Sequence, residues 1–123
     1  MERLNHSVNW VEIPVSNFAR ARKFYSTIFD HDIPDAIVGG VRMGFLPTDA
    51  MGFAICQGDH YVPSEWGALV YLNGGDDLNA ILGRIEEAGG TIMQPKKRIS
   101  EERGYVAICR DIEGNRIALH SRF

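Results

Sequence analysis

Two stretches of this chain share one pattern of apolar and polar positions, a strand-like run followed by a turn and an amphipathic helix. The first covers residues 9–30 and the second covers residues 67–90. A shift of sixty places aligns the apolar helix positions, Phe18 with Leu78, Ala21 with Ile81, Tyr25 with Ile85 and Ile28 with Ala88. These positions follow the 3.6-residue period of a helix with one buried face. The repeat predicts two copies of one module within the chain.

Short strand-like runs, separated by Gly, Pro and polar residues, follow each predicted helix. Each module therefore reads as βαβββ, over residues 6–57 and residues 67–121, within a single domain of residues 1–123. The segment of residues 95–104 reads as an exposed turn. A ferredoxin-like βαββαβ order is the alternative, but it leaves two strand-like runs unassigned. The predicted class is α+β, with strands at residues 6–15, 33–38, 41–46, 52–57, 68–72, 105–110 and 116–121 and another starting at 91–93.

Composition and charge narrow the range of partners. The net charge of −3 and the pI near 5.8 argue against a nucleic-acid partner, which requires a basic surface. No apolar run approaches the ~20 residues of a membrane span, and the N-terminal residues lack the apolar core of a signal peptide. We therefore expect no membrane partner and a cytoplasmic location. Cys56 and Cys109 lie in apolar runs, which favours buried free thiols over a single disulfide.

Neither module has enough strands to close around a core of its own. Two half-barrels set side by side instead form an open barrel with a central cleft. The first and last strands of each module supply its floor, and the two-residue period of a strand selects the inward side chains. The linking segment, residues 57–66, adds Tyr61 and Trp66, because large rings in a loop usually pack on the core or on a ligand. The predicted floor positions are Trp10, Glu12, Ala54, Cys56, Ala68, Val70, Ala118 and His120.

Three segments resemble the vicinal oxygen chelate superfamily, also called the glyoxalase/bleomycin resistance/dioxygenase superfamily. They are VEIPVSNFARARKFYSTIF, DDLNAILGRIEEAGG and RDIEGNRIALHS. The resemblance implies tandem βαβββ modules in a glyoxalase-like open barrel, a small-molecule ligand and a homodimer. Members of the superfamily include isomerases, lyases, ring-cleaving dioxygenases, thiol transferases and drug-sequestering proteins. The resemblance therefore does not select one activity.

The enzymes of this superfamily typically hold a divalent metal with His, Gln or Glu side chains from four strands. The resemblance places those positions at Trp10, Ala54, Ala68 and Ala118, with Gly67 or Val70 in place of Ala68 under a different alignment of the strands. An indole nitrogen is only a donor and alanine has no ligand atom, so we expect no metal cofactor at the usual site. We therefore expect no ordinary glyoxalase or dioxygenase chemistry, because that chemistry needs the metal. The expected role of Trp10 is to fill the space of the metal, and stacking on a planar guest is its alternative.

A carboxylate, a thiol and an imidazole lie two residues further along three of these strands, at Glu12, Cys56 and His120. Together they suit a shifted zinc site, proton transfer or thiol activation. Each residue also has a structural alternative. Glu12 pairs with an arginine such as Arg42 or Arg110, Cys56 fills the core, and His120 bonds a neighbour.

The leading hypothesis is a protein that binds a small organic molecule in a metal-free cleft. Its predicted contacts are Trp10, Glu12, Cys56, Tyr61, Trp66 and His120. The enzyme alternative is a metal-dependent lyase or isomerase, related to lactoylglutathione lyase, with a divalent ion at a site shifted to Glu12 and His120. A third hypothesis is an accessory domain whose surface serves a partner protein. The sequence identifies neither the ligand nor a catalytic residue.

Overall fold

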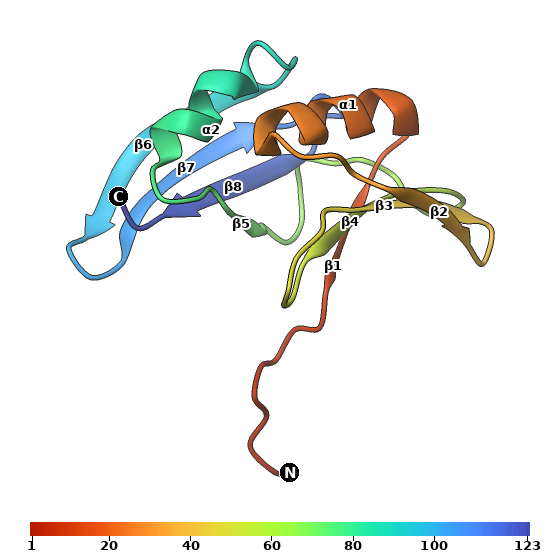
Figure 1. Cartoon of the computed structure of the whole chain (residues 1–123), viewed down its shortest axis with the longest axis horizontal. Helices are drawn as coiled ribbons and strands as arrows, with labels where there is room; N and C mark the ends of the chain where they lie inside the picture. The colour runs from red at the N-terminus through yellow and green to blue at the C-terminus, as the bar shows by residue number, and fades with distance from the viewer.

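The computed structural model describes residues 1–123 and shows two modules with the same order of elements (Figure 1). The first module contains β1 (Val11–Pro14), α1 (Phe18–Phe29), β2 (Asp35–Val38), β3 (Val41–Phe45) and β4 (Phe53–Gln57). The second contains β5 (Tyr71–Asn73), α2 (Leu78–Ile85), β6 (Thr91–Ser100), β7 (Gly104–Arg110) and β8 (Arg116–Ser121). The predicted α+β class and the tandem βαβββ order are confirmed. Neither helix is long and apolar enough to cross a membrane.

Each module forms a four-stranded mixed sheet, with strand orders β1-β4-β3-β2 and β5-β8-β7-β6. Strand β1 pairs in parallel with β4, and β5 pairs in parallel with β8. These parallel pairs are reached because a helix follows the first strand of each module and carries the chain back across the sheet. The two sheets remain separate, so the barrel is open. We call the space between the edges of β1 and β5 the seam.

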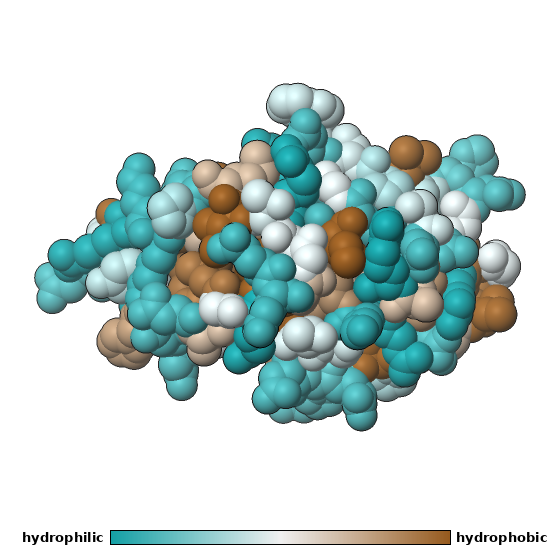
Figure 2. Space-filling view, turned by 90° about the horizontal axis from the view of Figure 1, so that it is seen from above, coloured by the Kyte–Doolittle hydropathy of each residue, from teal (hydrophilic) through white to brown (hydrophobic).

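One apolar core joins the two modules. A single cluster of 18 buried residues draws on both helices and on strands of both sheets. Helices α1 and α2 lie side by side over the same side of the two sheets (Figure 1). The outer face seen from above is mostly hydrophilic (Figure 2). The separation of a buried face from a hydrophilic face follows the predicted helical period. The buried residues of α1 are Phe18, Ala21, Phe24, Tyr25 and Ile28.

A buried carboxylate fastens the loop between β7 and β8 to α1. The Tyr25 hydroxyl donates to Asp111 Oδ2 over 2.6 Å. Asp111 Oδ1 accepts the backbone N–H groups of Glu113 and Asn115, and Oδ2 also accepts the Asn115 amide. All these donors satisfy a carboxylate that is only 3% exposed. The segment is therefore a structural joint between the modules.

The same loop also caps α1. Glu113 accepts the backbone N–H and the hydroxyl of Ser16, and it pairs with Arg20 at 2.6 Å. Burial works against ionisation of Glu113. The hydrogen bonds from Ser16 and Arg20 prevail and hold the pKa of Glu113 below its usual value. A carboxylate beside the N-terminal N–H groups of a helix also stabilises that helix.

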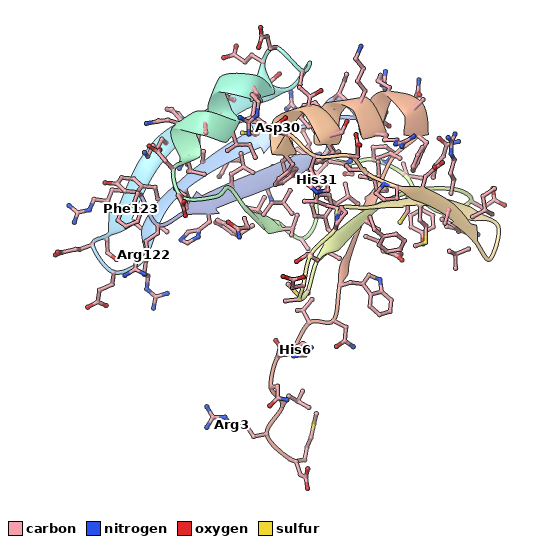
Figure 3. All side chains as sticks on the ribbon, in the orientation of Figure 1. Arg3, His6, Asp30, His31, Arg122 and Phe123 are labelled. Atoms are coloured by element: carbon pink, nitrogen blue, oxygen red, sulfur yellow. The ribbon has the colours of Figure 1, made fainter.

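Three strand boundaries differ from the prediction. Strand β6 continues to Ser100, so the predicted turn over residues 95–104 is mostly strand. Register shifts on both sides of Pro95 let this edge strand contain a residue that cannot donate to the ladder. Strand β5 begins at Tyr71, and β1 begins at Val11. The N-terminal residues before β1 extend away from the body of the molecule (Figures 1 and 3).

Candidate functional site

Strand alternation gives each sheet a core face under the helices and an opposite face, which we call the open face. In the first sheet Ile13 belongs to the core cluster. Glu12 lies beside Ala54 on the open face, and Cys56 follows on the same side. Ala54 and Cys56 are fully buried, and Tyr61 packs against the small cluster that they form. The structure thus brings together four of the residues expected at the cleft.

Glu12 is the centre of a hydrogen-bonded group on the open face. The Tyr61 hydroxyl donates to Glu12 Oε1 over 2.7 Å, and the Trp10 indole nitrogen lies 3.4 Å from Oε2. An ion pair of Glu12 with a nearby arginine was the structural alternative, and it is wrong. Both candidate arginines bind other carboxylates, Arg42 with Asp35 and Arg110 with Glu65.

The environment of Glu12 keeps its phenol and thiol neighbours protonated. The hydrogen bond to Glu12 raises the pKa of Tyr61 to about 12. Burial, followed by the charge of Glu12, raises the pKa of Cys56 to about 12. Because the thiolate is the reactive form of cysteine, Cys56 is not prepared to act as a nucleophile. Its role is that of a small buried core residue, as in the structural alternative.

His120 lies on the open face of the second sheet, but its recorded contact is with the backbone. Its Nε2 is 2.6 Å from the carbonyl oxygen of Arg103, in the turn between β6 and β7. No three His, Cys, Asp or Glu side chains of the chain are grouped so that they could hold a metal ion. Glu12, Cys56 and His120 therefore do not form the shifted metal site of the enzyme alternative.

A groove of about 510 Å³ lies at the seam. Most of its lining is apolar, and its charged side chains are Glu12 and Arg116. Trp66 lines the groove and is 78% exposed. Trp10 was expected to fill the space of the metal. Its side chain is 61% exposed, so it does not fill an enclosed space. The groove is the candidate site.

The predicted floor positions Ala68 and Val70 both line the groove, but they do not lie on the open face of β5. Val70 packs against the core, and Ala68 is exposed before the strand begins. The register of β5 with β8 instead places Tyr71 beside Ala118 on the open face. Residues 68–72 are all apolar or aromatic, so a two-residue period fits them in either phase. Pairing with β8 decides between the two phases.

A second cavity, of about 450 Å³, lies on the helix side of the seam. Core residues such as Phe53 and Leu72 form part of its walls. Its cation, Arg84, already donates to the carbonyl oxygen of Ile28, over 2.9 Å from Nε and 2.7 Å from Nη2. None of the six predicted ligand contacts lines this cavity. We interpret it as a packing gap between the modules.

Arg116 is a groove residue that the sequence analysis missed. Its Nε atom is buried without a hydrogen-bond partner, and no other buried side-chain nitrogen or oxygen of the chain is in this state. None of the ion pairs includes Arg116. It lies on the same face of β8 as Ala118 and His120, so the two-residue period of the strand could have identified it.

The sequence model of the Glyoxalase/Bleomycin resistance protein/Dioxygenase superfamily matches residues 7–119. The chain belongs to this superfamily. The resemblance of the three sequence segments is thereby confirmed. The matched residues include parts of both modules and both sides of the groove.

Individual proteins that resemble this chain share low sequence identity with it. The CFP32 proteins of Mycobacterium bovis and Mycobacterium tuberculosis, provisionally named as glyoxylases, are 26% identical over 121 residues, covering 90% of this chain and 44% of theirs. The chain thus spans less than half the length of these relatives. A glyoxalase/bleomycin resistance protein from Albidiferax ferrireducens T118 has a TM-score of 0.74 at 19% identity, covering 94% of this chain and 98% of that one. The fosfomycin resistance protein FosX of Listeria monocytogenes has a TM-score of 0.67 at 14% identity, covering 96% and 92%. At these identities the structures show a shared fold.

The positions that the resemblance assigns to metal ligands do not suit a divalent ion in this chain. The indole of Trp10 offers only a donor, and Ala54 and Ala118 carry no ligand atom. Ala68 is exposed outside the strand. What the site offers instead is a carboxylate held by ring donors, an unpaired guanidinium and exposed aromatic surface. Groups of these kinds are typical of sites that bind small molecules without covalent bonds.

Proposed function

We propose that the chain binds a small organic molecule in the groove through non-covalent contacts and without a protein-held metal. The observation that carries this proposal is the groove itself, with mostly apolar walls, two charged side chains and the exposed indole of Trp66. Small-molecule sites are typically concave and apolar, with a few polar groups that orient the ligand.

The exposed rings supply the binding surface. Covering about 100 Å² of apolar ring surface with a planar guest contributes about 2.5 kcal/mol. Trp10 and Tyr61 do not line the groove, but their indole and phenol donors hold Glu12, which does. This fixed arrangement lowers the ordering cost of binding.

Tryptophan fluorescence tests the proposal directly, because both tryptophans of the chain belong to this region. A panel of planar organic compounds should change the emission in a saturable manner. Trp66→Ala should weaken binding, measured by calorimetry, whereas His120→Ala should leave it unchanged because His120 does not line the groove.

Three results would contradict the proposal. Elemental analysis that finds about one zinc, nickel, iron or manganese per chain would refute its metal-free part. A divalent-ion-dependent turnover lost in both Glu12→Gln and His120→Ala would support the lyase or isomerase alternative. A protein partner that covers Trp66, with no small molecule bound by the free chain, would support the accessory-domain hypothesis.

We also propose that the chain is a cytoplasmic homodimer. The dimer is what the superfamily resemblance implies, and exposed apolar side chains outside the groove, such as Ile37 and Val38, are available for contact. Light scattering at several concentrations tests the assembly, and a monomer mass throughout would refute it. Fractionation of cells that express the full-length protein tests the location.

A further inference from the structure

Arg116 is the only cation that lines the groove. Its Nε atom is shielded from solvent, yet no protein acceptor reaches it. A buried donor without an acceptor is costly, and a charged donor more so. Native proteins leave few such groups, and those that line a groove are candidates for contact with a ligand.

The carboxylates around Arg116 are engaged elsewhere. Glu65 pairs with Arg110. Asp111 accepts the Tyr25 hydroxyl, two backbone N–H groups and a side-chain amide. Glu12 accepts two ring donors and forms no ion pair. The chain therefore provides no anion for this guanidinium.

We infer that the groove takes a small apolar monocarboxylate whose carboxylate binds Arg116 while its apolar body packs against Trp66. This inference rests on the proposed function of the groove. A guanidinium fits a carboxylate because its N–H groups form two parallel hydrogen bonds. Glu12, the only anion of the lining, disfavours a second negative charge on the ligand. The apolar remainder of the lining selects against a highly polar body.

Fluorine NMR with two probes of the same shape tests the inference. The probes are para-fluorophenylacetate and its neutral amide, para-fluorophenylacetamide. The wild-type chain should bind the carboxylate about tenfold or more tightly than the amide. Arg116→Gln should weaken carboxylate binding by roughly 10- to 100-fold, as expected for the loss of a charged hydrogen-bond pair. Amide binding should change little.

Two further variants separate the contact from general charge effects. Arg98→Gln removes the same charge from an exposed position of the same sheet and should keep the carboxylate preference. Arg116→Lys keeps the charge but loses the paired hydrogen bonds, so its affinity should fall between those of the wild type and Arg116→Gln. Circular dichroism should show that all the variants are folded.

The outcomes distinguish the inference from the proposed function. Equal binding of both probes, weakened for both by Trp66→Ala, would refute the role of Arg116 and leave the groove as a ligand site. An unchanged carboxylate preference in folded Arg116→Gln would refute it as well. If the wild-type chain binds neither probe, while other planar compounds change its fluorescence, the ligand class is wrong. If no compound binds, the proposed function also fails.

Discussion

The hydroxyl of Tyr25 offers a sharp test of the joint between the modules. The ring is fully buried in the shared core, and its hydroxyl donates to Asp111 in the loop between β7 and β8. Tyr25→Phe removes this single oxygen and leaves the ring in place. Because Phe nearly conserves the volume, the change leaves no sizeable cavity. The measured effect therefore reports on the hydrogen bond.

The expected loss of unfolding free energy is about 2 kcal/mol, because a hydrogen bond to a charged group contributes about 1.5–3 kcal/mol. The loss stays moderate because Asp111 retains three other donors, the backbone N–H groups of Glu113 and Asn115 and the Asn115 amide. An unfolding entropy of about 2.1 cal/mol/K per residue gives about 260 cal/mol/K for 123 residues. A loss of 2 kcal/mol then lowers Tm by about 8 °C.

Urea titration and thermal melting, followed by circular dichroism, measure both quantities. Tyr105→Phe is the matched control. Its ring lies near the core with Lys96 Nζ 4.6 Å from the ring centroid, and its hydroxyl forms no hydrogen bond within the chain. It should change stability by less than about 0.5 kcal/mol. Equal effects of the two substitutions, or no effect of Tyr25→Phe, would refute the role given to the Asp111 joint.

Other predictions concern single residues. The pKa of Glu113 is lowered in the folded chain, so its ionised form contributes fully above its ordinary pKa and loses this contribution as the pH falls through the folded value. Glu113→Gln should therefore flatten the loss of stability between about pH 5 and about pH 3 in urea titrations, and an unchanged slope would contradict this. Gly83→Ala in α2 meets open space and should raise stability by about 0.5–1 kcal/mol. Gly104→Ala should lower stability by more than about 2 kcal/mol in the same assay, because φ is +78° and the new Cβ would lie 2.3 Å from a backbone oxygen. Burial raises the pKa of Cys56, with a further increase from a nearby carboxylate, to about 12, and burial raises that of Cys109 to about 11. Both thiols should therefore resist iodoacetamide at neutral pH until the chain unfolds, and mass spectrometry of the intact protein would reveal early labelling.

The fold was predictable from sequence because the two helices have clear apolar faces. Seven of the eight residues that the repeat aligns lie in the core cluster, whereas Ala88 packs against the cluster beyond the end of α2. The βαβββ order of elements followed from the same repeat. Local patterns were sufficient here because core burial determines them.

The site was less predictable because its contacts depend on registers and loops. The pairing of Tyr71 with Ala118 selects the phase of β5, and the residues before it fit both phases. The bond from Tyr61 to Glu12 joins a loop to a strand 49 residues away. No period in the sequence encodes such a contact. Arg116 had the right period, but its missing partner becomes visible only in three dimensions.

The buried alanines explain why the candidate site lies at the seam. Small side chains at the positions of metal ligands would leave space on the open face of the first sheet. There Tyr61 packs against the cluster that contains Ala54, and Ala54 is fully buried. The ring therefore occupies part of the space above β4, and its hydroxyl fixes Glu12. Open volume remains between β1 and β5, where Trp66 and Arg116 line the groove. The packing of Tyr61 against the cluster that contains Ala54 thus leaves the seam as the hollow beside Glu12.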